Sequence, residues 1–115
     1  MEVTIYHNPR CSKSRQTLEL LKDKGIEPSI IEYLKTPPSA HEIADILHKL
    51  GRSPRELMRT KEAEYKEQGL DDSSLDDGAL ISAMVATPKL IERPIVLAGG
   101  KAAIGRPPES VLEIL

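Results

Sequence analysis

VTIYHNPRCSKSRQTLELLKDK, residues 3–24, is the stretch that decides the fold. Its first residues belong to a mostly apolar segment, Glu2 to Tyr6, that is typical of a short strand. The Asn8-Pro9 pair just after this segment predicts a turn. From Ser12 to Lys24 leucines gather on one side and charged residues on the other, which predicts a helix that Gly25 ends. Cys11 therefore stands where the first strand gives way to the first helix.

The rest of the chain extends this unit. A second strand is predicted over Ser29–Leu34, which completes a β-α-β unit with two parallel strands. A helical block of about residues 39–86 follows, opened by a capping box of Ser39 and Glu42. Within this block the patterns also predict a helix that begins at Ser53 and helices over Glu62–Gln68 and Asp77–Val85. After the block they predict a strand over Ile95–Leu97, a hairpin turn at Gly99-Gly100 and a returning strand over Lys101–Ile104. A last helix is predicted over Glu109–Ile114.

These elements predict an α/β fold with a mixed four-stranded sheet, in one domain of residues 1–115 with an inserted helical block. The core must be aliphatic, because the chain has no Trp, no Phe and three Tyr, although 39% of its residues are hydrophobic. The net charge is −2, from 16 basic and 18 acidic residues, so we expect neither nucleic acid nor a membrane as a partner. No apolar run reaches the roughly 18 residues of a membrane span. The N-terminus lacks a signal-peptide pattern, which favours a cytoplasmic protein.

Cys11 is the residue best placed for chemistry. Free N–H groups and the positive end of a helix dipole stabilise a thiolate, and Arg10, Lys13 and Arg15 add positive charge nearby. The same N–H groups can bind an anionic oxygen. The alternative is an inert, buried thiol that acts only as a small hydrophobic residue. Cys11 is also the only cysteine, which excludes an intramolecular disulfide and fits a reducing compartment.

The sequence around Cys11 resembles the active-site loop of the glutaredoxin-coupled arsenate reductase family, ArsC, and most of all its YfgD-type branch. The resemblance spans nearly the whole chain. The segments that carry it are His7-Asn8-Pro9-Arg10-Cys11-Ser12-Lys13-Ser14-Arg15, Tyr33-Leu34-Lys35-Thr36-Pro37-Pro38, Glu56-Leu57-Met58-Arg59, Ile91-Glu92-Arg93-Pro94-Ile95-Val96 and Gly105-Arg106-Pro107-Pro108.

The resemblance implies a thioredoxin-like fold and an oxidoreductase that reduces arsenate to arsenite. In the family, the cysteine attacks arsenate, glutathione attacks the adduct, and glutaredoxin removes the glutathione. A single cysteine suits this scheme because the resolving thiol comes from another molecule. Glutathione is then a co-substrate, and we expect no tightly bound cofactor and no metal, since one Cys and three scattered His show no ligand spacing. We also expect a monomer.

The resemblance also assigns roles to single residues. Cys11 is the nucleophile, and Arg59, Arg93 and Arg106 correspond to the three anion-binding arginines of the family. Guanidinium groups suit this role because they bind tetrahedral oxyanions bidentately and keep their charge. Pro94 corresponds to the cis-proline that thioredoxin-like folds place beside the cysteine. Each arginine has an alternative role as an ordinary solvated side chain.

Two further residues are candidates for tuning the thiolate. His7 could act through a hydrogen bond or through charge, or could simply pack at the strand end. Ser14 forms a Cys-x-x-Ser spacing with Cys11, and its hydroxyl could donate to the thiolate or cap the helix.

Two other functions stay open. Ser12 follows Cys11 where arsenate reductases of this type usually have Gly, so a glutathione-linked thiol oxidoreductase with another substrate is possible. A regulator like the Spx proteins, which bind RNA polymerase, is the second alternative. Spx proteins typically carry Cys-x-x-Cys and lack the full arginine set, which favours the enzyme.

Overall fold

The computed structural model describes residues 2–115, and the chain forms two compact units. The first unit consists of the chain up to Thr36 together with Arg93–Leu115, and the second unit is Pro37–Glu92. The expectation of a single domain with an insertion of about residues 39–86 stays a prediction. In residues 2–115 no helix is both long and apolar enough to cross a membrane.

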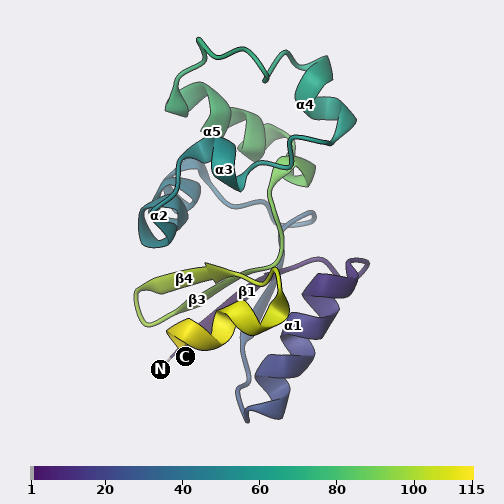
Figure 1. The fold of residues 1–115 in the computed structure, drawn as a ribbon, viewed down its shortest axis with the longest axis vertical. Helices are drawn as coiled ribbons and strands as arrows, with labels where there is room; N and C mark the ends of the chain where they lie inside the picture. The colour runs from purple at the N-terminus through teal and green to yellow at the C-terminus, as the bar shows by residue number, and fades with distance from the viewer. Residues whose placement is uncertain (1) are drawn as a thin grey trace. The chain divides into compact units, whose positions relative to one another are not determined.

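The first unit is built on a four-stranded sheet with the strand order β2-β1-β3-β4 (Figure 1). Strands β1 and β2 are parallel, whereas β3 pairs antiparallel with both β1 and β4, so the predicted mixed sheet is confirmed. The strands are β1 (Val3–His7), β2 (Ser29–Glu32), β3 (Ile95–Ala98) and β4 (Lys101–Ile104).

The register of these strands brings three loops to one edge of the sheet. Ile95, the first residue of β3, pairs with Tyr6 near the end of β1 and with Ile104 at the end of β4. Consequently the loop after β1, the residues before β3 and the residues after β4 lie beside one another. These three segments contain Cys11, Arg93 and Arg106.

One face of the sheet is covered by α1 (Ser12–Asp23) and by the C-terminal 3₁₀ helix η2 (Pro108–Ile114), which contact each other. The buried core of this unit is aliphatic, as the composition requires. Its members are Val3, Ile5, Leu21, Val96, Ala98 and Val111. Burial of such side chains contributes roughly 25 cal/mol per Å² of apolar surface, so this core fixes α1 on the sheet and Cys11 at the sheet edge.

The second unit is helical. Its elements are α2 (Ala40–Leu50), α3 (Pro54–Leu57), α4 (Ala63–Glu67), α5 (Asp77–Ala86) and the 3₁₀ helix η1 (Pro88–Leu90). The predicted capping box at α2 is present: the Glu42 N–H donates to the Ser39 hydroxyl at 3.1 Å, and the Ser39 N–H donates to the Glu42 carboxylate at 2.9 Å. Helix α5 contacts α2, α3 and η1.

Most element boundaries lie within one residue of the sequence expectations, and two elements differ by more than that or in type. Strand β2 ends at Glu32 instead of Leu34, because Lys35 and Thr36 donate their N–H groups to the Glu32 carbonyl in a turn. The last helix, η2, is a 3₁₀ helix and not an α-helix, and the Ser110 N–H donates a hydrogen bond to the Pro107 carbonyl at its start. A segment this short gains few α-helical bonds, which favours the tighter 3₁₀ geometry.

Candidate active site around Cys11

Cys11 is the N-cap residue of α1, and its side chain is 8% exposed. Its backbone is extended and enters the helix in a fixed direction, because the Cys11 N–H donates to the Asn8 carbonyl and the Cys11 carbonyl accepts from the Arg15 N–H, both at 3.0 Å. The side chain of an N-cap Ser, Thr, Asp or Asn usually accepts a hydrogen bond from a free N–H group of the first helical turn. The Cys11 side chain makes no such cap hydrogen bond, so its sulfur lies beside the N–H groups of the first turn without closing them off.

The environment of the sulfur favours the thiolate. Burial by itself opposes ionisation of Cys11, but the backbone N–H of Ser14, the Arg93 charge, the backbone N–H of Lys13 and the Arg106 charge outweigh it. Together they hold the pKa of the Cys11 thiol below its ordinary value.

Arg106 is the cation in direct contact with the sulfur. Its Nη2 lies 3.5 Å from Cys11 Sγ, while its Nε donates to the Arg93 backbone carbonyl at 2.8 Å. The second bond fixes the plane of the guanidinium, so the group reaches the sulfur in one orientation.

Arg93 and Pro94 stand between the other two segments. The Arg93–Pro94 peptide bond is cis, and so is Arg106–Pro107. The Pro94 carbonyl accepts from the Gly105 N–H at 3.0 Å, which ties the segment before β3 to the segment after β4. Arg93 thereby supplies both charge toward Cys11 and the carbonyl that orients Arg106.

His7 and Ser14 form a buried pair behind the loop. His7 Nδ1 lies 2.6 Å from the Ser14 hydroxyl oxygen, and the Asn8 N–H donates to the same oxygen at 3.0 Å. Burial is the main cause that lowers the pKa of His7; Lys22 and Arg15 lower it further and Glu32 opposes them. His7 is therefore a neutral hydrogen-bonding group at neutral pH. The Ser14 group that faces the sulfur is the backbone N–H.

Arg59 belongs to the second unit. Its N–H donates to the Leu90 carbonyl at 2.7 Å, and its guanidinium Nη2 lies 2.7 Å from the Glu62 carboxylate. The other Glu62 oxygen is 3.5 Å from Lys89 Nζ. The Arg59 guanidinium is therefore ion-paired with the Glu62 carboxylate, which is an oxygen anion.

Three residues that shape the loop were not singled out from the sequence. Asn8 accepts from the Arg10 N–H through its side-chain oxygen at 3.0 Å and donates its own N–H to Ser14. Thr17 and Gly105 are both buried beside Pro94. An Asn-Pro turn is a recognisable signal for Asn8, but a close approach between distant segments leaves no signal in a single sequence.

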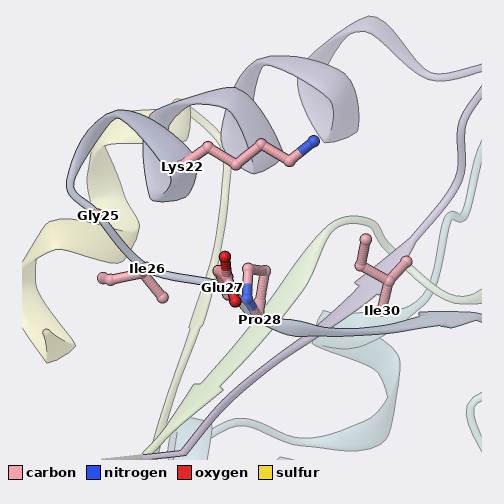
Figure 2. Close-up of a pocket in the computed structure, with 6 residues that line it drawn as sticks. All are labelled: Lys22, Gly25, Ile26, Glu27, Pro28 and Ile30. Atoms are coloured by element: carbon pink, nitrogen blue, oxygen red, sulfur yellow. The ribbon is translucent and has the colours of Figure 1, made fainter.

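A hollow of about 420 Å³ lies elsewhere on the first unit (Figure 2). Its lining residues, at the C-terminal end of α1 and the start of β2, are Lys22, Gly25, Ile26, Glu27, Pro28 and Ile30. Cys11 is at the opposite end of α1, and a 12-residue helix is about 18 Å long. The hollow is therefore separate from the site around Cys11.

Comparison with known proteins agrees with this geometry. The sequence pattern described as "ArsC family" matches residues 6–114. The chain is 64% identical to the "Uncharacterized protein YfgD" of Escherichia coli K12, covering 99% of this chain and 97% of that protein. It is 53% identical to the "Arsenate reductase" of Neisseria meningitidis serogroup B, covering 99% and 98%.

A solved structure named "Arsenate reductase from Vibrio cholerae" superposes with a TM-score of 0.98 at 57% identity, covering 100% of this chain and 98% of that one. The thioredoxin-like α/β fold expected from the sequence is thereby confirmed. By sequence pattern, by relatives and by fold, the chain belongs to the ArsC family.

Proposed function

We propose that this protein is a cysteine-dependent arsenate reductase that takes its reducing equivalents from glutathione and glutaredoxin. The observation that carries the proposal is the contact of the Arg106 guanidinium with the Cys11 sulfur at 3.5 Å, in an environment where the backbone N–H groups of Ser14 and Lys13 and the charge of Arg93 also lower the pKa of the thiol. This environment stabilises a thiolate and attracts an oxyanion at the same place. The arsenate reductases among its relatives suggest which oxyanion it is.

The first step forms a sulfur–arsenic bond. The Cys11 thiolate attacks the arsenic of arsenate, one arsenic–oxygen bond breaks, and the departing oxygen leaves as water after protonation. Arsenic is still pentavalent in this adduct. Arg93 and Arg106 bind the oxygens that remain on arsenic, because guanidinium groups match a tetrahedral oxyanion.

The second and third steps need external thiols, since Cys11 is the only cysteine. A glutathione thiolate attacks the Cys11 sulfur, and the sulfur–arsenic bond breaks with its electron pair left on arsenic, which departs as trivalent arsenite. Cys11 is then joined to glutathione in a mixed disulfide. A glutaredoxin thiol attacks the glutathione sulfur and frees Cys11. A second glutathione restores glutaredoxin, so the net reaction converts arsenate and two glutathiones to arsenite, glutathione disulfide and water.

The proposal keeps Arg59 as the third oxyanion-binding arginine, as the resemblance to the family implies. Its guanidinium pairs with the Glu62 carboxylate, which supports its capacity to bind an oxygen anion. The neutral His7 would act by holding Ser14, whose backbone N–H faces the sulfur, so both tune the thiolate indirectly.

The proposal includes a monomeric, cytoplasmic protein without a tightly bound cofactor. A reducing cytoplasm keeps a lone thiol available and contains the glutathione that the proposed reaction consumes.

The test is arsenate reduction with glutathione, glutaredoxin and glutathione reductase, with wild type compared with Cys11→Ser. Wild type should consume reducing equivalents and release arsenite, and Cys11→Ser should be inactive while folding normally. Equal rates in the two proteins would overturn the role of Cys11. Inactivity of both with arsenate, together with turnover of a glutathione mixed disulfide, would favour the thiol oxidoreductase; capture of RNA polymerase without turnover would favour the regulator.

A further inference from the structure

Gly105 occupies a space in which no side chain fits. A Cβ atom on Gly105 would lie 2.4 Å from Thr17 Oγ1, 2.8 Å from Pro94 Cγ and 3.1 Å from Thr17 Cγ2. Its φ is not in the left-handed region, so the backbone would accept any L-residue. Glycine is needed here for close packing alone.

The atoms that surround Gly105 cannot easily move. Thr17 is fully buried, and its hydroxyl donates to the Lys13 carbonyl at 2.8 Å in the first turn of α1. As a β-branched residue it has few rotamers to exchange. Pro94 is buried and accepts from the Gly105 N–H at 3.0 Å. A Cβ on Gly105 would therefore move the Gly105–Arg106 backbone itself.

Such a movement would separate Arg106 from the sulfur. Arg106 follows Gly105 directly, and its guanidinium is held by the Arg93 carbonyl at 2.8 Å and reaches Cys11 Sγ at 3.5 Å. Hydrogen bonds weaken steeply once donor and acceptor separate beyond these distances.

We propose that Gly105 is a positioning residue whose missing side chain lets the segment after β4 pack on Thr17 and Pro94 and so sets Arg106 on the Cys11 sulfur. This inference rests on the proposed function only for the role of Cys11 as nucleophile. It assigns the charge environment of the thiol to a packing contact between the segment after β4 and the side chains of Thr17 and Pro94.

The experiment is Gly105→Ala, with the rate of Cys11 alkylation by iodoacetamide followed as a function of pH. We expect the pKa of Cys11 to rise and the alkylation rate at pH values below that pKa to fall by about tenfold, the loss expected for one charge-assisted hydrogen bond. Iodoacetamide is neutral, so the measurement needs neither arsenate nor glutaredoxin. In the coupled assay the KM for arsenate should rise as well.

A double-variant cycle separates positioning from general damage. Arg106→Ala should raise the pKa of Cys11, and adding Gly105→Ala to it should change that pKa no further, because the charge is already gone. Thr17→Ala removes both Thr17 atoms that the new Cβ would meet. Gly105→Ala combined with Thr17→Ala should therefore recover part of the alkylation rate. If Gly105→Ala alone does not fold, the double variant is compared with Thr17→Ala alone. The pKa of Cys11 should then be higher in the double variant, by less than the rise expected for Gly105→Ala alone.

Gly78→Ala is the matched control, because its Cβ would meet only Asp76 Oδ1 at 3.5 Å, an ordinary contact in α5. It should leave the alkylation profile unchanged. A folded Gly105→Ala protein with the wild-type profile, or additive effects of Gly105→Ala and Arg106→Ala, would overturn the inference. If Arg106→Ala itself leaves the profile unchanged, the role of Arg106 in the proposed function fails as well.

Discussion

The Arg106 guanidinium lies 3.5 Å from the Cys11 sulfur, although the two residues are 95 positions apart in the sequence. Strand pairing explains how they meet: β1 ends, β3 begins and β4 ends at the same edge of the sheet. Cys11 follows β1 and Arg106 follows β4. The nucleophile and its cation are therefore brought together by an antiparallel register.

Substitution of Arg106 should change the acidity of the thiol. Arg106→Ala removes the charge next to the sulfur and should raise the pKa of Cys11, whereas Arg106→Lys keeps a charge without the fork and should raise it less. The pH profile of alkylation measures this, with the urea-unfolded chain as reference. Arg52→Ala, an exposed arginine of the second unit, is the control. Identical profiles for Arg106→Ala and Arg52→Ala would contradict the prediction.

His7 should make the protein less stable in mild acid. Burial lowers the pKa of His7 in the folded protein below the 6.5 of an unfolded chain, so the unfolded state binds the proton more readily. The stabilisation is fully present above pH 6.5 and is lost as the pH falls from 6.5 through the folded-state pKa. Urea unfolding at several pH values should show this slope.

His7→Gln should flatten that slope, since glutamine does not titrate. The exposed His41→Gln is its control and should keep the wild-type slope. A slope that persists undiminished in His7→Gln would assign the acid sensitivity to other groups.

Ser14→Ala should destabilise the fold and not only the site. Ser14 is fully buried, and its hydroxyl bonds to His7 at 2.6 Å and to the Asn8 N–H at 3.0 Å. Removing it leaves buried polar groups unsatisfied, at a cost of about 1–3 kcal/mol. Ser12→Ala, two residues before Ser14 and exposed, should cost no more than about 0.5 kcal/mol. Chemical denaturation measures both, and equal stabilities would count against the buried pair.

Arg55→Met should destabilise the second unit. The Arg55 guanidinium donates to the Tyr65 hydroxyl and to the backbone carbonyls of Leu70 and Asp72, the latter at 3.0 Å, so one side chain holds the segment after α4. Hydrogen bonds to a charged group contribute about 1.5–3 kcal/mol, so we expect a loss of about 2 kcal/mol in unfolding free energy. Arg52→Met is the control, since Arg52 is exposed. Retention of wild-type stability by Arg55→Met would show that this network is dispensable.

Much of the secondary structure could be predicted from local signals. The capping box of Ser39 and Glu42 marked the start of α2, and Gly25 and Gly51, both with positive φ, follow the ends of α1 and α2. These signals work because caps and left-handed residues depend on the few residues around them. The 3₁₀ form of η2 could not be predicted in this way, since it differs from an α-helix by a small balance of hydrogen bonds.

The sequence by itself determined the position of Cys11 at a helix start, because a strand, an Asn-Pro turn and an amphipathic helix are local patterns. Only the tertiary structure decided what surrounds the sulfur. The contact of Arg106 with Cys11, the neutral His7 on Ser14 and the close packing of Gly105 on Thr17 all join residues from different elements. Such contacts depend on strand register and burial, and these are properties of the assembled sheet and core rather than of any one segment.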